Sequence, residues 1–399
     1  MQTGLDVLLT ALAVPVAAAA VYQVVIAVAA FFYAGSTGGR QRGRPSTRLA
    51  VLVPAHDEAA LIARCVSSLK KQTYPADLFD VVVIADNCSD ETAAIARSNG
   101  ADVLVRVDLD RPGKGRALRW AIDKLLSGRR PPDAVVIVDA DSVADPGLLA
   151  ALVRPFETGA RVVQGESLLS EDGSPQSALR AAAFLLVNHV RPSGRAVLGL
   201  PSNLAGNGML LGRAVLETNP WDAYTSAEDV EYSVGLRMAG IRVVFGAGAI
   251  LRTPTPPNAR AAEQQRLRWE GGKLHLAYRR CPRLVWHAIR ERRPLLVDAA
   301  VELALPPLGL LTAAAVLGAV LAAVLAWLGL VGASAVVPWL VAVGAIPLYV
   351  LLGFRAGHAP RSAYRALLRA PLFVVTKTVR SYRLIAFRSD TWVRTQRAE

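Results

Sequence analysis

Long uncharged stretches alternate with charged ones along this chain, and they predict where it meets a membrane. No charged residue occurs between Asp6 and Arg40, and the apolar run 8–34 exceeds the roughly 20 residues that a membrane-spanning helix needs. A cleaved signal peptide is the alternative, although the run is long for one and no clear cleavage site precedes the polar sequence. The pattern favours a retained membrane helix.

A second uncharged stretch, between Glu302 and Arg355, has room for two helices. A Gly-Ala-Ser turn in its middle divides it into a predicted hairpin, residues 303–331 and 336–354. Two consecutive prolines at 306–307 predict a kink or a late helix start.

Basic residues cluster beside all three predicted helices, at 40–48, 279–293 and 355–369. By the positive-inside rule these flanks face the cytoplasm, which predicts a multi-pass protein of the cell membrane with a cytoplasmic domain. We therefore expect four parts: a helix with its basic flank (1–44), a cytoplasmic domain (45–295), a transmembrane hairpin (296–355) and a basic amphipathic tail (356–399). Residues 366–387 predict an interfacial helix in contact with membrane lipids, or an ordinary solvated helix.

Composition agrees with this division. The 399 residues are 53% hydrophobic, and the net charge of +13 lies largely at the membrane flanks. That placement leaves little support for nucleic acid as a partner. The three cysteines are far apart, so neither a disulfide framework nor a cysteine zinc site is expected.

Within the domain, short β-branched runs alternate with helical patterns. Strands are predicted at 49–53, 81–85, 103–107 and 135–138, and helices at 58–71, 91–99 and 115–126. This alternation predicts an α/β fold with a mostly parallel, Rossmann-like sheet. Ligands of such sheets bind beyond the carboxyl ends of the strands, where acidic and amide side chains gather in this chain.

Asp139 and Asp141 follow the fourth strand, one residue apart. Such a pair can share Mg²⁺ or Mn²⁺ and the phosphates that the ion carries, whereas capping would need only one side chain. Asp145 is instead expected to cap a helix that begins at Pro146. Glu58 and Asp86 could hold a base and a ribose, or cap the next helix. Lys114, between two glycines, could reach a diphosphate or remain a solvated loop lysine.

Five motifs in order resemble the membrane-bound family 2 glycosyltransferases with a GT-A domain. They are P-A-H-D-E, A-D-N-C-S-D-E-T, P-G-K-G-R-A-L, V-D-A-D-S and S-A-E-D-V-E, followed by Q-R-L-R-W, which matches the Q-x-x-R-W signature of cellulose, chitin and hyaluronan synthase-like enzymes. The resemblance covers about residues 48–275.

The resemblance implies a sugar transfer from a nucleotide sugar, expected to be UDP-linked, with inversion at the transferred carbon. Asp229, beside Glu228, would be the general base, and Asp139 and Asp141 would hold Mg²⁺ or Mn²⁺. The implied substrate-binding residues are Pro54, Glu58, Asp86, Lys114, Asp139, Gly206, Asn207, Gly208, Gln265, Arg268 and Trp269. From the residues alone, a surface helix pair at 228–229 and a core tryptophan at 269 are the alternatives.

The membrane part is smaller than that of polymer-extruding members, so addition of one sugar to a lipid-linked acceptor and growth of a polysaccharide both stay open. A helix at 176–190 is predicted to lie in the membrane plane and hold the acceptor, or to be structural. A non-catalytic nucleotide-binding partner of another transferase is the alternative function.

Overall fold

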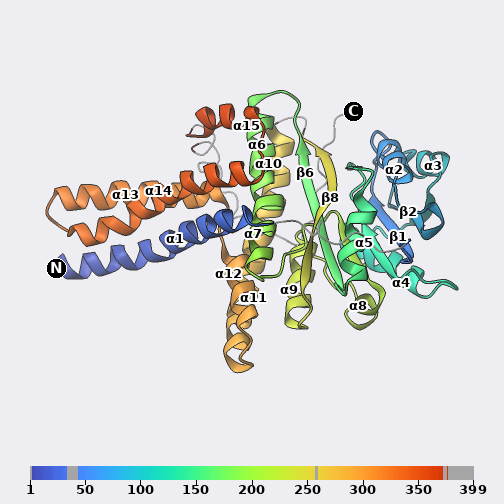
Figure 1. Cartoon of the computed structure of the whole chain (residues 1–399), viewed down its shortest axis with the longest axis horizontal. Helices are drawn as coiled ribbons and strands as arrows, with labels where there is room; N and C mark the ends of the chain where they lie inside the picture. The colour runs from blue at the N-terminus through green and yellow to red at the C-terminus, as the bar shows by residue number, and fades with distance from the viewer. Residues whose placement is uncertain (1, 34–43, 257–258, 372–374, 376–399) are drawn as a thin grey trace. The chain divides into compact units, whose positions relative to one another are not determined.

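The computed structural model describes residues 2–33, 44–256, 259–371 and 375, which form two compact units (Figure 1). We call the first the helical unit; its described residues fall within Met1–Tyr33, Gly173–Leu198 and Ala304–Ala386. The second, the α/β unit, falls within Ala34–Asp172 and Gly199–Leu303. The segment Gly173–Leu198 thus packs with the apolar helices, although it lies inside the range 45–295 that the sequence assigns to one domain.

The α/β unit is built on one mixed sheet. Among the described residues it has eight strands in the order β3-β2-β1-β4-β7-β6-β8-β5. The strands β3, β2, β1 and β4 are mutually parallel, whereas β7 runs antiparallel to both β4 and β6. The strands are β1 (Leu49–Ala55), β2 (Phe79–Asp86), β3 (Asp102–Arg106), β4 (Ala134–Ile137), β5 (Val143–Ala144), β6 (Val162–Ser170), β7 (Met209–Gly212) and β8 (Val243–Pro254).

Helices cover both faces of this sheet. Val51 and Val53 of β1 point to one face, in a core shared with α2, α3 and α5, while Leu52 points to the other, in a core shared with α4, α8 and α9. Because both faces are buried, the central strands read as continuous apolar runs. The helices are α2 (Ile62–Lys70), η2 (Ala76–Leu78), α3 (Thr92–Ser98), α4 (Lys114–Leu126), α5 (Leu148–Glu157), α8 (Arg213–Thr218) and α9 (Glu228–Met238). The predicted α/β fold with a mostly parallel sheet is confirmed.

After β8 the chain becomes helical. It forms α10 (Ala259–Arg266), a π-helical turn η4 (Leu267–Gly271), α11 (Gly272–Arg290) and α12 (Pro294–Ala304). A buried network ties α12 to α9: Arg237 donates to the carboxylate of Asp298 at 2.8 Å and to the side-chain oxygen of Asn203 at 2.8 Å. This network fixes the carboxyl end of α9 within the unit.

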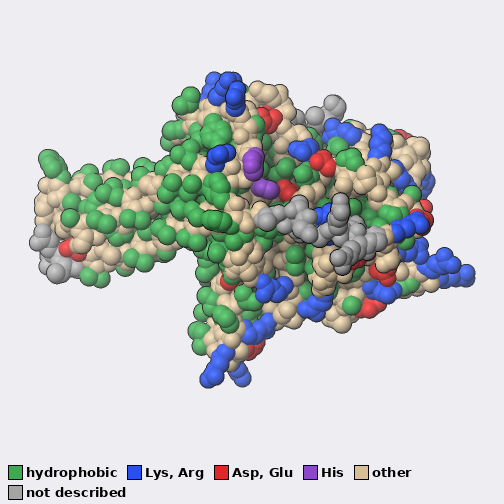
Figure 2. Space-filling model, in the orientation of Figure 1, with side chains coloured by type: hydrophobic (Ala, Val, Ile, Leu, Met, Phe, Trp, Pro, Cys, Tyr) green, Lys and Arg blue, Asp and Glu red, His purple; other side chains and the backbone are tan. Residues whose placement is uncertain are grey.

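The helical unit contains α1 (Gln2–Ala30), α6 (Pro175–Leu185), η3 (Leu186–Val190), α7 (Arg191–Val197), α13 (Leu308–Trp327), α14 (Ala333–Ala356), α15 (Arg361–Ala366) and η5 (Leu367–Arg369). In the described chain, three helices are long and apolar enough to cross a membrane: Gly4–Ala30, Leu308–Trp327 and Ala333–Ala356. Their surfaces are largely hydrophobic (Figure 2). Small residues allow close contact, since Gly194 of α7 lies directly against the backbone of Ile26 in α1.

Several local expectations are refined. The first apolar helix starts at Gln2 rather than at Leu8, and α13 starts late, at Leu308, directly after the two prolines. The predicted side-chain cap at Asp145 is wrong: Gly147 is the N-cap of α5, and the carboxylate of Asp145 pairs with Arg252 at 3.4 Å. The predicted interfacial helix at 366–387 falls mostly outside the described residues.

Candidate active site

The carboxyl ends of β2 and β3 hold a buried ion pair. Asp86 ends β2 and faces Arg106 at the end of β3, with 2.5 Å between a carboxylate oxygen and a guanidinium nitrogen. Burial raises the pKa of Asp86, and the hydrogen bonds and charge of Arg106 offset only part of that effect. Pro54 lies in the neighbouring strand β1, and the buried Glu58 follows it, donating its backbone N–H to the Thr92 hydroxyl at 2.8 Å.

Arg106 was not among the residues selected from the sequence. The only available signal was a basic residue at the carboxyl end of a predicted strand, which is common on surfaces. Its buried position and its bond to Asp86 identify it here as the partner that fixes this carboxylate.

Lys114 lies at the centre of the site. Its ammonium donates to Asp139 Oδ1 at 2.6 Å and to the carbonyl oxygen of Gly206 at 2.7 Å, and it lies 3.5 Å from Glu228. Burial disfavours the charged lysine, but Asp139 and Glu228 outweigh that effect and raise its pKa. A solvated loop lysine would show none of these bonds, so Lys114 is not the solvated lysine that the sequence left as an alternative.

The glycines around Lys114 permit this placement. Gly113 has φ +118, a conformation that other residues rarely adopt. Gly115 lies so close to the carbonyl oxygen of Ala223 that an added Cβ would come within 2.1 Å of it. Helix α4 can therefore begin at Lys114 and pack tightly only because no side chain flanks the lysine.

Asp139 is held by the loop that precedes β7. Its backbone N–H donates to the side-chain oxygen of Asn207 at 3.0 Å, and the amide nitrogen of Asn207 donates to the Ser142 hydroxyl at 2.8 Å. Gly208, with φ +69, donates its N–H to the carbonyl oxygen of Ile137 at 2.9 Å. The buried Asn207 therefore positions the end of β4, while Gly206 faces the acidic centre.

Glu228 and Asp229 are the first two residues of α9. Asp229 Oδ1 accepts the N–H of Val230 at 2.8 Å, and its other oxygen lies 3.1 Å from where a Cβ on Gly206 would be. Burial and the neighbouring Glu228 charge raise the pKa of Asp229 to about 7, opposed by the Lys114 ammonium. A carboxylate that titrates near neutral pH suits a general base.

Two sets of acidic side chains offer ligands for a divalent metal ion. Asp141 is buried, and the Ser142 hydroxyl donates to it at 3.4 Å; together with Asp139 it offers the hard oxygen ligands that Mg²⁺ and Mn²⁺ accept. The ligand atoms of Asp57, Cys88 and Asp90 also lie close enough together. That group includes a soft thiol, and its carboxylates already accept backbone N–H groups. Asp139 likewise already accepts a hydrogen bond from Lys114, so the carboxylates of both groups have partners within the protein.

The Q-x-x-R-W residues lie in α10 and η4, directly before α11. Gln265 lies in the last turn of α10, and Arg268 and Trp269 lie in η4. The Trp269 side chain is 41% exposed. Gly272, the first residue of α11, lies so close to Ser226 that an added Cβ would come within 2.7 Å of the Ser226 hydroxyl oxygen. Among the described residues, neither Gln265 nor Arg268 bonds to the Lys114 cluster. Trp269 is not a core residue, which removes the structural alternative for it.

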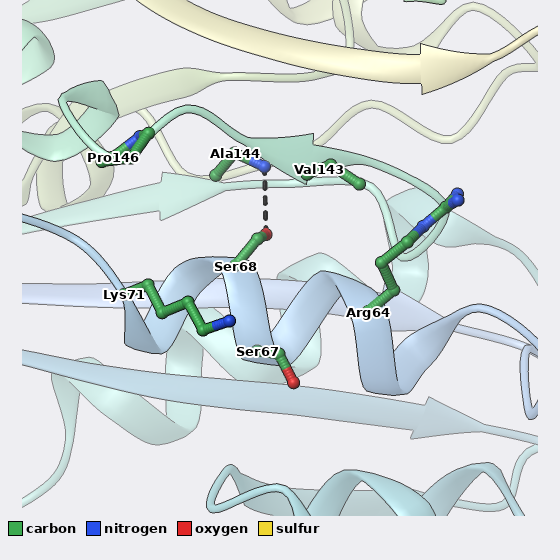
Figure 3. Close-up of a pocket in the computed structure, with 7 residues that line it drawn as sticks. All are labelled: Arg64, Ser67, Ser68, Lys71, Val143, Ala144 and Pro146. Atoms are coloured by element: carbon green, nitrogen blue, oxygen red, sulfur yellow. Dashed lines mark hydrogen bonds between the residues drawn. The ribbon is translucent and has the colours of Figure 1, made fainter.

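A separate pocket of about 300 Å³ lies between α2 and β5 (Figure 3). Its lining residues are Arg64, Ser67, Ser68, Lys71, Val143, Ala144 and Pro146. Ser68 accepts the backbone N–H of Ala144 at 3.0 Å, which joins the two walls. None of the candidate site residues lines this pocket, so it is distinct from the Lys114 cluster.

Known proteins with similar sequences are glycosyltransferases. The probable glycosyltransferase YdaM of Bacillus subtilis is 22% identical over 244 residues, 59% of this chain and 58% of that protein. The beta-monoglucosyldiacylglycerol synthase of Synechocystis is 26% identical over 235 residues, 57% of this chain and 48% of that protein. The chain thus spans about half the length of the curated relatives it matches.

A solved structure shares the fold. The mannosyltransferase PcManGT from Pyrobaculum calidifontis, in complex with GDP-Man and Mn²⁺, superposes with a TM-score of 0.50 at 20% identity, over 86% of this chain and 97% of that one. The sequence model of the family described as glycosyltransferase like family 2 matches residues 45–272, more than half of the chain. This chain belongs to glycosyltransferase-like family 2.

Proposed function

We propose that this chain is an inverting hexosyltransferase that moves a sugar from a nucleoside-diphosphate sugar to an acceptor hydroxyl at the cytoplasmic face of a membrane. The observation that carries the proposal is the convergence on Lys114 of Asp139 from the end of β4 and Glu228 from the start of α9. Lys114 thereby links Asp139, which we expect beside the donor diphosphate, to Glu228 and its neighbour Asp229, which we expect beside the acceptor.

The geometry supports a single displacement. Asp229 lies over Gly206, so an acceptor hydroxyl approaching the glycine loop would meet a carboxylate able to take its proton. The hydroxyl oxygen forms a bond to the anomeric carbon while the bond from that carbon to the diphosphate oxygen breaks. The proton goes to Asp229, the electron pair goes to the leaving diphosphate, and the sugar configuration is inverted.

Lys114 and a divalent ion would share the diphosphate charge. Asp139 and Asp141 would hold Mg²⁺ or Mn²⁺, which when bound stabilises negative charge on phosphate oxygens. Lys114 already pairs with Asp139, so it is positioned to contact the same phosphates. Arg268 and Trp269 would cover the diphosphate and the acceptor end from η4.

Asp86, fixed by Arg106, and Glu58 would bind the nucleoside, with Pro54 supporting the same strand end. We propose UDP as the nucleotide, in line with the resemblance to the cellulose, chitin and hyaluronan synthase-like enzymes. The solved relative from Pyrobaculum calidifontis holds GDP-Man, so a guanine donor is the outcome to test against it.

The acceptor is proposed to be a lipid-linked glycan or a growing polysaccharide. Three helices long and apolar enough to span a bilayer support a membrane location, and the Synechocystis relative is named for a glycolipid product. The alternative is a nucleotide-binding partner that does not catalyse transfer. The presence of both the Asp139/Asp141 pair and the perturbed Asp229 argues against that alternative.

The test is nucleotide release by the purified full chain across UDP- and GDP-sugars, with Mg²⁺, Mn²⁺ or EDTA. We expect metal-dependent release with one donor and its loss in Asp141→Ala. Asp145→Ala is the matched control, because that carboxylate pairs with Arg252 rather than with Lys114. Nucleotide binding by calorimetry without release, in the presence of membrane lipid extracts as acceptor, would refute catalysis and support the silent partner.

A further inference from the structure

Helix α11 exposes a stripe of large apolar side chains. Leu274, Tyr278, Val285 and Ile289 recur at spacings of four, seven and four, which places them on one helix face. Tyr278 is 84% exposed and Ile289 is 73% exposed, and Trp286 borders the stripe at 53%. Exposed apolar side chains on this scale commonly mark a surface that contacts a partner or a membrane.

A different face of α11 is occupied. Leu276, Ala277, Leu284 and Ala288 are buried in a cluster with Val234 of α9 and with α12. Arg280 adds an ion pair to Glu231 of α9 at 3.5 Å. The helix therefore has a fixed orientation within the α/β unit, and the stripe stays outside.

A row of arginines borders the stripe. At 100° per residue, Arg279, Arg283 and Arg290 fall beside Trp286, and the guanidinium of Arg290 lies 4.9 Å from the centre of that ring. Hydrophobic side chains lie along one edge of the α11 and α12 region and basic ones along the other and at its end (Figure 2). The α11 sequence contains no acidic residue.

We propose that α11 lies in the membrane–water interface, with the stripe inserted between lipids and the arginines at anionic headgroups. An apolar face with tryptophan and tyrosine, bordered by arginine, is the composition of helices that lie in this layer. The proposal rests on the membrane attachment proposed above. It adds a second contact that the membrane-spanning helices do not supply.

The chain connection and the charge favour lipid over other occupants. Residues 291–307 separate α11 from α13, the next candidate membrane helix, and α12 takes up most of them over roughly 16 Å. The length of this connection therefore limits how far the end of α11 can lie from a helix that would cross the bilayer. A second copy would present the same basic row, so like charges would oppose pairing of two α11 faces.

An interfacial α11 would also determine how far the active site lies from the membrane surface. The buried face of α11 packs on α9, whose first residues include Asp229, so an α11 held in the interface would hold α9 close beneath the headgroups. A lipid-linked hydroxyl would then have a short path to Asp229.

The test is a depth measurement on the full chain in lipid nanodiscs, with or without anionic lipid. Cys88 and Cys281 are replaced by serine, and the buried Cys65 is retained. A spin label is attached to one introduced cysteine at a time, and its accessibility to oxygen and to a water-soluble nickel chelate is measured. The labelled variants are Tyr278→Cys and Ile289→Cys in the stripe, Leu317→Cys in α13 as the membrane control, and Val107→Cys, an exposed position directly after the edge strand β3, as the water control.

We expect labels at 278 and 289 to favour oxygen, as at 317, and to do so more strongly with anionic lipid. The label at 107 should favour the nickel chelate. The proposal is overturned if the stripe labels behave like the label at 107. It is also overturned if they are shielded from both reagents, which would indicate a protein partner or a second copy. A label at 317 that favours water would show instead that the membrane attachment itself has failed.

Discussion

Replacing the general-base candidate by Asp229→Asn should abolish transfer and at the same time stabilise the protein at neutral pH. The two effects have one cause, because the site holds this carboxylate in surroundings that disfavour its charge. Burial and Glu228 raise its pKa from the ordinary 3.8 to about 7. An asparagine amide of the same shape carries no charge and escapes that penalty.

The magnitude follows from proton linkage. The difference between the two pKa values corresponds to about 4 kcal/mol at most. Because Asp229 retains partial solvent access and shares the Lys114 ammonium with Glu228, we expect only part of this, about 1–2 kcal/mol, to appear as stability. For a unit of this size, that is a rise in Tm of roughly 2–8 °C.

The raised pKa of Asp229 also predicts how the stability of the wild-type protein depends on pH. Between pH values near 3.8 and 7 the folded protein keeps a proton on Asp229 that the unfolded chain has released, so wild-type stability falls as pH rises through this window. The gain from Asp229→Asn should therefore grow from about pH 4, level off above about pH 7 and vanish at lower pH. Wild-type kcat/KM should rise over the same upper range as the base loses its proton.

The assay is thermal unfolding of the detergent-purified chain between pH 4 and 8, with nucleotide release measured in parallel. Asp80→Asn is the control, because that carboxylate is exposed and pairs with Arg48 at the surface. Equal Tm shifts in both variants would refute the buried-charge argument. Transfer activity retained by Asp229→Asn would refute its role as the base.

Three other substitutions test the same structure. Lys114→Met should leave its carboxylate partners uncompensated and weaken nucleotide-sugar binding more than tenfold by calorimetry, and unchanged affinity would remove the lysine from the donor site. Gly115→Ala should lower stability by about 1–3 kcal/mol in denaturation, because its Cβ meets a backbone oxygen, whereas Gly147→Ala, where the space is open, should be nearly neutral. Arg237→Met should cost about 3–5 kcal/mol by removing one partner of a buried ion pair, and a loss no larger than that of the half-exposed Arg213→Met would contradict this.

Local patterns in the sequence were sufficient to predict the elements and to select some of the candidate site residues. The apolar runs predicted three candidate membrane helices, and the alternation of strands and helices predicted the α/β fold, because each depends on the periodicity of a short segment. Asp86 and Asp139 were selected as candidates for the same reason: a polar residue directly after a predicted buried strand lies at the sheet edge where ligands bind.

The partners of those residues required the tertiary structure. Lys114 meets Asp139, Gly206 and Glu228, which are distant from it in the sequence, and no periodicity joins them. The role of Arg106 depends on strand order, because it meets Asp86 only when β2 and β3 pair in parallel.

Burial was likewise decided by packing. The amphipathic pattern of α11 does not say how much of its apolar surface other elements cover, and only the structure shows that α9 and α12 leave the stripe at Tyr278 exposed. The sequence by itself determined which segments are apolar and where charges stand along the chain. The tertiary structure decided which charges meet and which apolar faces stay open, because both depend on contacts between residues that are far apart in the sequence.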